Sequence, residues 1–388
     1  MIRRILLAGT VGLGIMSAFP AEAVPQFALL TGNRCVNCHV TNQGGGQRSE
    51  LGRYAMEGVS LLSPESVGLA GLFDALSTEG GGPVEWGFDF RAQTVRSHVS
   101  SQTDRRYFPM QAAVYASSAA TEWLTLEGTY NFGPKKFDGQ ERWSASAMLQ
   151  PDFNWPQLRI GYFQPSVGLR FDDHTMFPRS TAVSSGSQSL IAPNYAEMAA
   201  ELTYYRYRWL TVTAGIAGAR SLAENRVDDF MGRPISLVVD EDRPSLLGRI
   251  ALWPRAAQGR LNFSLGASYL RNDDFDLLNL FGGIGYQDRL YVQGELAFQE
   301  KLALREGRNG SVEAGVQLLD SVIGYARGEV GRTKLYRSTG DSEVTTKHLV
   351  IGLQAIVLPG IEIRPEYRLL DTEVFRSGRY AVQFHIFR

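Results

Sequence analysis

From residue 84 onward, apolar and polar residues alternate along the chain with a period of two. In residues 84–93 the apolar side chains fall on one face and the polar ones on the other. The same pattern is clearest again in residues 124–132, 210–216, 261–269, 290–298, 349–357 and 380–386. We count about 16 such segments of roughly 10 residues, the length that a tilted membrane strand needs. The pattern predicts strands that face lipid on one side and water on the other.

The connections between these segments alternate in length. Short turns are predicted near Ala119-Ala120 and at 154–156, 206–208, 255–259, 287–288, 320–321 and 358–360. Longer polar links are predicted at 99–108, 133–141, 167–193, 220–244, 271–276, 299–309, 333–343 and 371–378. Outer-membrane barrels have short turns in the periplasm and longer loops outside, and an even strand count leaves both barrel ends in the periplasm. A soluble β-sandwich is the alternative, but it does not predict this alternation.

We therefore predict a mainly β fold, with an antiparallel transmembrane β-barrel of about 16 strands over residues 84–388. Residues 1–23 read as a secretory signal peptide, with Arg3 and Arg4, an apolar middle and Ala21-Glu22-Ala23 as the cleavage site. No later stretch approaches the about 20 apolar residues of a membrane-spanning helix. The formal net charge of −1 gives no reason to expect binding to nucleic acid.

Residues 24–82 form a separate unit that contains the only two cysteines of the 388-residue chain. They belong to Cys35-Val36-Asn37-Cys38-His39, a C-x-x-C-H motif typical of covalent haem c, with His39 as the proximal iron ligand. The alternatives are a disulfide or two inert thiols, and a thioredoxin-like motif would not need His39. Short helices are predicted at 49–58 and 64–76, so the unit is expected to be a small α-helical monohaem domain.

Two residues are candidates for the distal ligand of the haem iron. Met56 lies in the first predicted helix, although a methionine there is also an ordinary core residue. His174 lies in the long link 167–193, which can fold into the lumen as the third loop of general diffusion porins does, or stay solvated. Acidic groups at 228–229, 240–242 and 273–276 can attract Fe²⁺ or Mn²⁺, or simply be solvated loop tips. No nucleophile–base pair, phosphate loop or zinc spacing is present, so no catalytic residue is predicted.

The N-terminal unit and the barrel together resemble the fused outer-membrane monohaem cytochrome–porins of iron-oxidising bacteria and their relatives. The residues that carry the resemblance are Pro25-Gln26-Phe27-Ala28, Thr31-Gly32, the C-x-x-C-H motif, Leu51-Gly52-Arg53-Tyr54 and Gly58. The resemblance implies one haem in or at the mouth of the barrel, held by Cys35, Cys38 and His39. This chain departs from the pattern at Leu29-Leu30, where relatives have basic and aromatic residues, and in its glycine-rich residues 41–48.

The function implied by this resemblance is an electron conduit of the bacterial outer membrane. Electrons would pass through one covalent haem c from extracellular Fe(II), or another external donor or acceptor, to periplasmic cytochromes or other redox carriers. An Fe(II) oxidase activity of the cytochrome type is one form of this hypothesis. The alternative is a substrate-selective porin with a redox-sensing or plugging haem domain, and a third hypothesis is a scaffold for a multihaem cytochrome. In each case the barrel contacts outer-membrane lipids, and the haem domain lies on the periplasmic side or inside the lumen.

Overall fold

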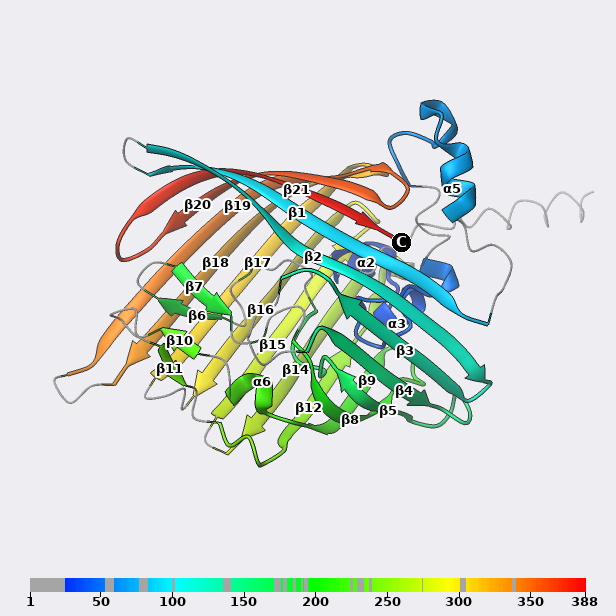
Figure 1. Cartoon of the computed structure of the whole chain (residues 1–388), viewed down its shortest axis with the longest axis horizontal. Helices are drawn as coiled ribbons and strands as arrows, with labels where there is room; N and C mark the ends of the chain where they lie inside the picture. Colours follow the sequence, from blue (N-terminus) through cyan, green and yellow to red (C-terminus); the bar gives the residue numbers. More distant parts are fainter. Residues whose placement is uncertain are drawn as a thin grey trace, which may run out of the picture.

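Across the part of the chain that the structure describes, sixteen long antiparallel strands close into a barrel (Figure 1). The ring is closed by β1 (Glu85–Val99) and β21 (Arg376–Phe387), with Asp89 opposite Phe387 and His98 opposite Gly378. This computed structural model describes residues 25–52, 59–76, 83–99, 102–134, 141–170, 176, 180–183, 186–189, 191, 195–223, 226–228, 234–236, 239–273, 275–300, 305–336 and 340–388. The predicted signal peptide lies outside them. The predicted fold class is confirmed.

The other strands of the wall follow one another around the ring in chain order. They are β2 (Gln102–Thr121), β3 (Leu124–Asn131), β4 (Trp143–Leu149), β5 (Gln157–Phe163), β8 (Glu197–Tyr204), β9 (Leu210–Ala217), β12 (Ser245–Leu252), β14 (Leu261–Asn272), β15 (Phe275–Tyr286), β16 (Leu290–Glu300), β17 (Arg305–Leu319), β18 (Val322–Leu335), β19 (Ser342–Leu358) and β20 (Ile361–Asp371). A two-residue strand, β13 (Arg255–Ala256), and a 3-10 turn, η3 (Ala257–Gly259), form the connection between β12 and β14.

The two faces of the wall differ in polarity as the alternation predicts. On β19, Leu349, Ile351 and Leu353 are exposed on the outside, whereas His348 and Gln354 face inward and are buried. The same division holds around the ring and gives a barrel with an apolar exterior and a polar interior. An exterior of this kind is what a bilayer requires of a membrane barrel. Separately, none of the helices in the described residues is long and apolar enough to cross a membrane.

The strands extend further into the predicted links than the sequence suggested. The hairpin of β1 and β2 continues through the predicted link 99–108, because β2 already begins at Gln102. The first short turn falls at Glu122-Trp123 rather than at Ala119-Ala120, which still belong to β2. Polar residues at the rim of a barrel are compatible with strand structure, so a polar run alone does not mark the end of a strand.

Two links contain structure of their own. Between β5 and β8 lie β6 (Ser180–Val183) and β7 (Gly186–Ser189), which pair with each other. Between β9 and β12 lie α6 (Arg220–Ala223), β10 (Arg226–Asp228) and β11 (Pro234–Ser236). We call residues 164–196 loop 3, because they form the third link on the side away from the short turns.

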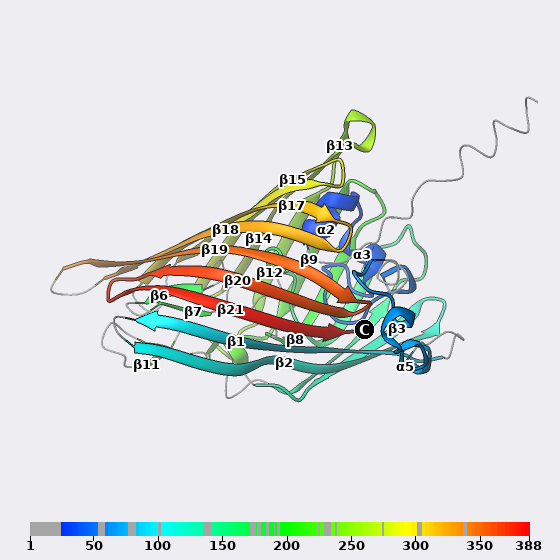
Figure 2. The same cartoon turned by 90° about the horizontal axis from the view of Figure 1, so that it is seen from above.

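The N-terminal residues lie at the end of the barrel where β21 finishes. Figures 1 and 2 show α2 (Pro25–Thr31) and α3 (Cys35–Cys38) within the ring of strands there, and α5 (Ala70–Leu76) beyond the strand ends. The helix predicted for 64–76 is divided into η2 (Glu65–Val67) and α5, since Gly68 between them has a left-handed φ of 72°. Helix α2 was not predicted.

Candidate functional site

Helix α2 packs directly on the inner wall of the barrel. Phe27, Leu29 and Leu30 form an apolar cluster with Tyr291 and Ile323, whose side chains point into the lumen. The Asn262 amide on β14 donates to the carbonyl oxygens of Leu29 at 2.9 Å and Leu30 at 3.3 Å. These bonds satisfy carbonyls at the C-terminal end of α2, which have no partner within the helix.

The close approach of α2 to the wall depends on a glycine. A Cβ on Gly285 of β15 would overlap the carbonyl of Leu29, so only glycine lets the helix backbone reach this strand. Gln26 at the start of α2 donates to Gln354 on β19 at 3.2 Å. The helix is therefore fixed to three parts of the wall at once.

The cysteine motif follows α2 and is held in a compact turn. The His39 N–H donates to the Cys35 carbonyl at 3.0 Å, and Cys38 and His39 are buried, at 2% and 4% exposure. The Ser49 N–H donates to the Cys38 carbonyl at 3.0 Å, and the Ser49 hydroxyl accepts from Gly52 N–H at 3.3 Å. Ser49 thus caps the next helical turn, as the sequence predicts. A Cβ on Gly52 would overlap the Cys38 carbonyl, so this turn too requires glycine.

The donor set of this turn fits a covalent haem c. Cys35 and Cys38, both within the described residues, form no disulfide, and they flank one helical turn with His39 next in sequence. Burial, with a smaller contribution from Cys35, raises the pKa of the Cys38 thiol to about 11. Cys38 is therefore a neutral thiol at physiological pH, held beside a buried imidazole. The sulfur and nitrogen atoms needed for thioether attachment and proximal ligation are thus together.

Residues 25–52, which we call the plug, contact strands from much of the ring. Arg34 donates to the Tyr205 carbonyl at 2.8 Å in the turn between β8 and β9, and Asn42 donates to Gln157 on β5 at 2.7 Å. Arg48 lies over the Phe387 ring of β21, 4.1 Å from its centroid. Together with α2 on β14–β16, these contacts place the plug across the short-turn mouth of the lumen.

Loop 3 folds into the lumen and meets the plug. Gly168 N–H donates to Ser268 on β14 at 2.7 Å, and Leu169 N–H donates to Glu295 on β16 at 3.0 Å. Gly168 has a φ of 62°, and a Cβ there would overlap the Glu295 carboxylate. On the other side, the Gln43 amide of the plug donates to the Ser166 hydroxyl of loop 3. The inward course considered for this loop is confirmed for the described residues.

Further from the plug, loop 3 and its neighbours pack a cluster of apolar side chains inside the barrel. The cluster consists of Phe163, Val167, Ile191, Tyr195, Ala199, Ala217, Leu222, Leu247, Leu270, Phe275, Leu277 and Ala297, with Val239 packed against it. Loop 3 continues to the far wall, where Ala182 N–H donates to Thr333 on β18 at 2.9 Å. On this side of the barrel, a packed apolar core therefore occupies part of the lumen.

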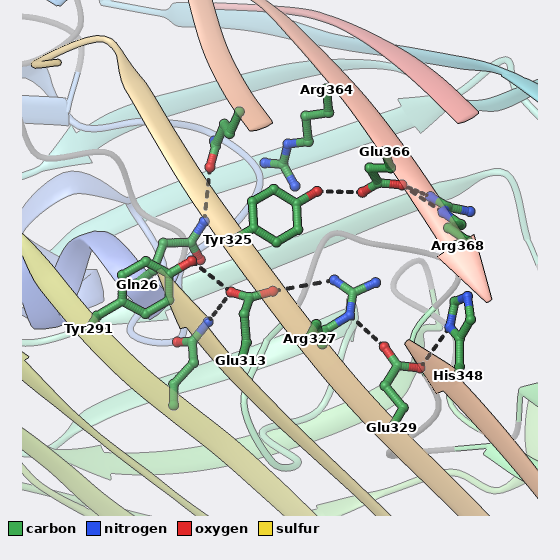
Figure 3. A network of polar contacts seen from close by, with 12 residues as sticks. Gln26, Tyr291, Glu313, Tyr325, Arg327, Glu329, His348, Arg364, Glu366 and Arg368 are labelled. Carbon is green, nitrogen blue, oxygen red and sulfur yellow. Dashed lines mark hydrogen bonds and ion pairs between the residues drawn. The ribbon is translucent and has the colours of Figure 1, made fainter. Parts of the chain in front are cut away.

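The wall formed by β16–β20 carries a buried polar network (Figure 3). Tyr291 donates to Glu313 at 2.9 Å, and Arg327 bridges Glu313 at 3.4 Å and Glu329 at 2.5 Å. Glu329 also contacts His348 Nδ1 at 3.4 Å. The Arg327 side chain is only 3% exposed, so its charge is compensated by these carboxylates and not by water.

A second row of polar contacts runs beside the first. Tyr325 on β18 donates to Glu366 on β20, and Arg368 pairs with Glu366. Arg368 also donates to Gln93 of β1 at 3.4 Å. In this row, acid and arginine occupy positions two apart on one strand, both facing inward. The network was missed from the sequence, because only the register shows which charges meet across strands.

Some candidate residues lie outside what the structure describes. Met56 and His174, the two candidates for the distal ligand, are both there, so their roles stay predictions.

Of the acidic groups, Asp240 and Asp273 both pair with Arg243, each at 3.0 Å. Among the described residues no group of three or more His, Cys, Asp or Glu is placed to hold a metal ion. An arginine bridge is thus the observed partner of this acidic cluster.

Comparison with known proteins supports the barrel. No protein-family model matches the chain, and no curated protein matches its sequence. Among solved structures, the chain is similar to OprB of Pseudomonas putida, at a TM-score of 0.54 and 9% identity over 84% of this chain and 97% of that one. It is also similar to the outer membrane channel DcaP of Acinetobacter baumannii, at a TM-score of 0.52 and 11% identity over 79% of this chain and 97% of that one. OmpF of Salmonella typhi gives a TM-score of 0.51 and 11% identity over 78% of this chain and 97% of that one.

The similarity concerns the fold of outer-membrane barrels and covers most of the chain. The resemblance of the N-terminal unit to cytochrome–porins is a separate matter and stays a prediction. Identities near 10% establish a shared fold alone.

Proposed function

We propose that this protein is a channel-type barrel of the bacterial outer membrane whose lumen is closed by its own N-terminal plug. The observation that carries the proposal is the position of residues 25–52 inside the short-turn mouth, bound to strands around much of the ring. The apolar exterior and polar inner wall support a location in the outer membrane, in contact with its lipids.

We further propose that the plug carries one covalent haem c. Cys35 and Cys38 would hold it by thioether bonds, and His39 would be the proximal ligand, with Met56 and His174 as candidates for the distal position. A bound haem supplies one-electron redox chemistry. The contribution of the chain is to bury Cys38 and His39 and to fix their turn against the wall, which excludes bulk water and limits rearrangement. The plug would then sense redox state or gate a solute path.

The second candidate function is an electron conduit. It is favoured by the apolar core inside the barrel, which includes Phe163, Val167 and Tyr195, because a conduit must carry electrons without leaking solutes. In this form, electrons would pass between an external donor such as Fe(II) and periplasmic cytochromes or other carriers, through the single haem. An Fe(II) oxidase activity belongs to this candidate function alone.

Solute flux and electron flux distinguish the two candidates. The full protein is reconstituted in liposomes, and sugar-driven swelling is measured beside reduction of an encapsulated acceptor by external Fe(II). Electron transfer without swelling would favour the conduit, and swelling without electron transfer would favour the channel. The absorption spectrum and a haem stain after denaturation test the cofactor, with Cys35→Ala/Cys38→Ala as the control that should lose covalent haem.

The plug itself is tested by a variant that unseats α2. Gly285→Leu places a side chain where the Leu29 carbonyl lies, and Asn262→Ala removes the donor to Leu29 and Leu30. Both are expected to raise single-channel conductance in planar bilayers. Gly248→Ala on β12 is the matched control, because a Cβ there meets nothing within 4 Å. Unchanged conductance in both variants, with normal barrel folding, would contradict a closing role for the plug.

A further inference from the structure

Residues 59–76 form an arm that leaves the lumen at the short-turn end. Val59 is buried with Ile356 and Phe387, and the backbone N–H groups of Leu61 and Leu62 donate to the Ile356 and Val357 carbonyls at 2.9 and 3.0 Å. From there the chain passes over the end of β19. Figures 1 and 2 show that α5, the last part of the arm, lies by the C-terminal end of β21 and beyond the strand ends.

The arm exposes an unusual number of large apolar side chains for a short segment. They are Leu61, Leu62, Val67, Leu69 and Leu72, which are between 37% and 54% exposed. The backbone of the arm is nevertheless ordered by local bonds, such as Leu69 N–H to the Pro64 carbonyl at 2.8 Å. An ordered segment that presents leucines outward is a surface prepared for an apolar partner.

The chain after the arm joins the apolar exterior of the barrel. The start of the arm packs on Ile356, which faces inward on β19, and the wall resumes with Val84, 54% exposed just before β1, and Trp86, 41% exposed on the outside of β1. The Pro83 carbonyl, just before β1, accepts from Ser118 on β2 at 2.5 Å. Other tryptophans at this end, Trp123, Trp155 and Trp209, are also exposed, as in the aromatic girdle that marks the headgroup level of a membrane barrel.

We propose that this arm is an interfacial anchor whose leucines insert into the periplasmic leaflet of the outer membrane. The charges favour apolar insertion over attraction to headgroups, since Glu65 and Asp74 are the charged residues of 59–76 and neither lysine nor arginine occurs there. Binding is therefore insensitive to salt. The anchor rests on the proposed membrane location of the barrel, but not on the haem or on the closing role of the plug.

Site-specific photo-crosslinking in proteoliposomes of phosphatidylethanolamine tests the anchor. p-Benzoylphenylalanine replaces Leu72 in the full protein, with Ser66 on the same arm as the control and Ile351 on the outside of β19 as the reference for lipid contact. We expect lipid adducts at 72 at about ten times the yield at 66, as expected for burial of a leucine-sized group, with equal yields at low and high salt. If the yield of lipid adducts at residue 72 were no higher than at residue 66, while residue 351 gave adducts, the anchor alone would be overturned.

The same variants in whole cells separate lipid from protein as the occupant. A protein adduct at 72 in place of the lipid adduct would overturn the anchor and identify a docking partner. Absence of lipid adducts at 351 as well would overturn the membrane location together with the anchor. Because the reference site lies on a strand and the test site on the arm, these two failures are distinguishable.

Discussion

Glu201 of β8 holds Ser166 of loop 3 with both of its carboxylate oxygens. The Ser166 N–H donates to one oxygen at 2.6 Å and the hydroxyl donates to the other at 2.7 Å, with all three groups buried. Gln43 of the plug donates to the same hydroxyl. One serine thus joins the plug to loop 3 and both to the wall.

Glu201→Gln is expected to loosen this junction. The substitution removes the charge that strengthens the two hydrogen bonds, and bonds to charged groups contribute about 1.5–3 kcal/mol each. We expect a loss of about 1–3 kcal/mol in the free energy of unfolding, measured by urea titration in detergent micelles, and faster proteolysis within loop 3. Ser118→Ala is the control, because its hydrogen bond to the Pro83 carbonyl is exposed. Equal effects of the two substitutions would contradict the junction.

Arg327→Met is expected to be more damaging than loss of an exposed arginine. It would leave Glu313 and Glu329 buried without the cation that bridges them, which costs about 3–5 kcal/mol. Arg243→Met, which breaks an ion-pair bridge at a side chain 67% exposed, should cost less than about 1 kcal/mol.

The triple variant Arg327→Met/Glu313→Gln/Glu329→Gln then tests the cause of the loss. Because it removes the uncompensated charges, it should recover most of the stability that Arg327→Met loses, as measured by the same urea titration. A triple variant that is less stable than the single one would show that hydrogen bonding, and not charge compensation, is the main contribution of this network.

The outer face of the barrel can be predicted directly from the sequence, whereas the position of the plug inside the barrel cannot. Leu349, Ile351 and Leu353 alternate with polar residues, and a period of two fixes which of them face lipid. The plug gives no such signal. Helix α2 is seven residues long, and it is held by contacts with Asn262 and Gly285, more than 200 positions away in the chain. Only the folded register brings them together.

The C-x-x-C-H motif likewise combines features that the sequence predicts with one that only the fold shows. Cys35, Cys38 and His39 are recognisable from spacing alone, and the Ser49 cap was readable from its position before the helix. The depth of the motif in the lumen was open, because a unit on the periplasmic side can hang below a barrel or enter it. The contacts of Asn42 with Gln157 on β5 and of Gln26 with Gln354 on β19, on a separate part of the ring, place these residues within the barrel mouth.

The protonation of Cys38 predicts a pH-dependent reactivity in haem-free protein. Its pKa is raised from 9.0 to about 11, so the folded plug keeps this proton at pH values where an unfolded chain would lose it. At pH 8 the thiolate fraction is about a hundredfold lower than for an ordinary thiol, and alkylation by iodoacetamide should be slower by a similar factor. The contribution of this protonation to the free energy of unfolding is fully present below about pH 9 and is lost as the pH rises towards about 11.

Mass spectrometry of the alkylated peptide measures both cysteines in one experiment. Cys35 is only partly buried and serves as the internal comparison, and urea-unfolded protein gives the rate of the unhindered thiols. Equal rates for Cys38 in folded and unfolded protein at pH 8 would show that the motif is not buried in the lumen.

Gly52→Ala is expected to reduce covalent haem attachment. A Cβ at this position would overlap the Cys38 carbonyl, and backbone atoms cannot move aside without displacing the turn that holds both thiols and His39. We expect the haem content per barrel, measured by the pyridine haemochrome spectrum, to fall to about one tenth or less, the effect of about 1.4 kcal/mol or more of strain on the attachment-competent turn. Gly71→Ala in α5 is the matched control, since a Cβ there meets nothing within 4 Å and alanine favours a helix. If Gly52→Ala and Gly71→Ala retained equal haem, the turn would be free to shift, and the close contact between residue 52 and Cys38 would not be required for attachment.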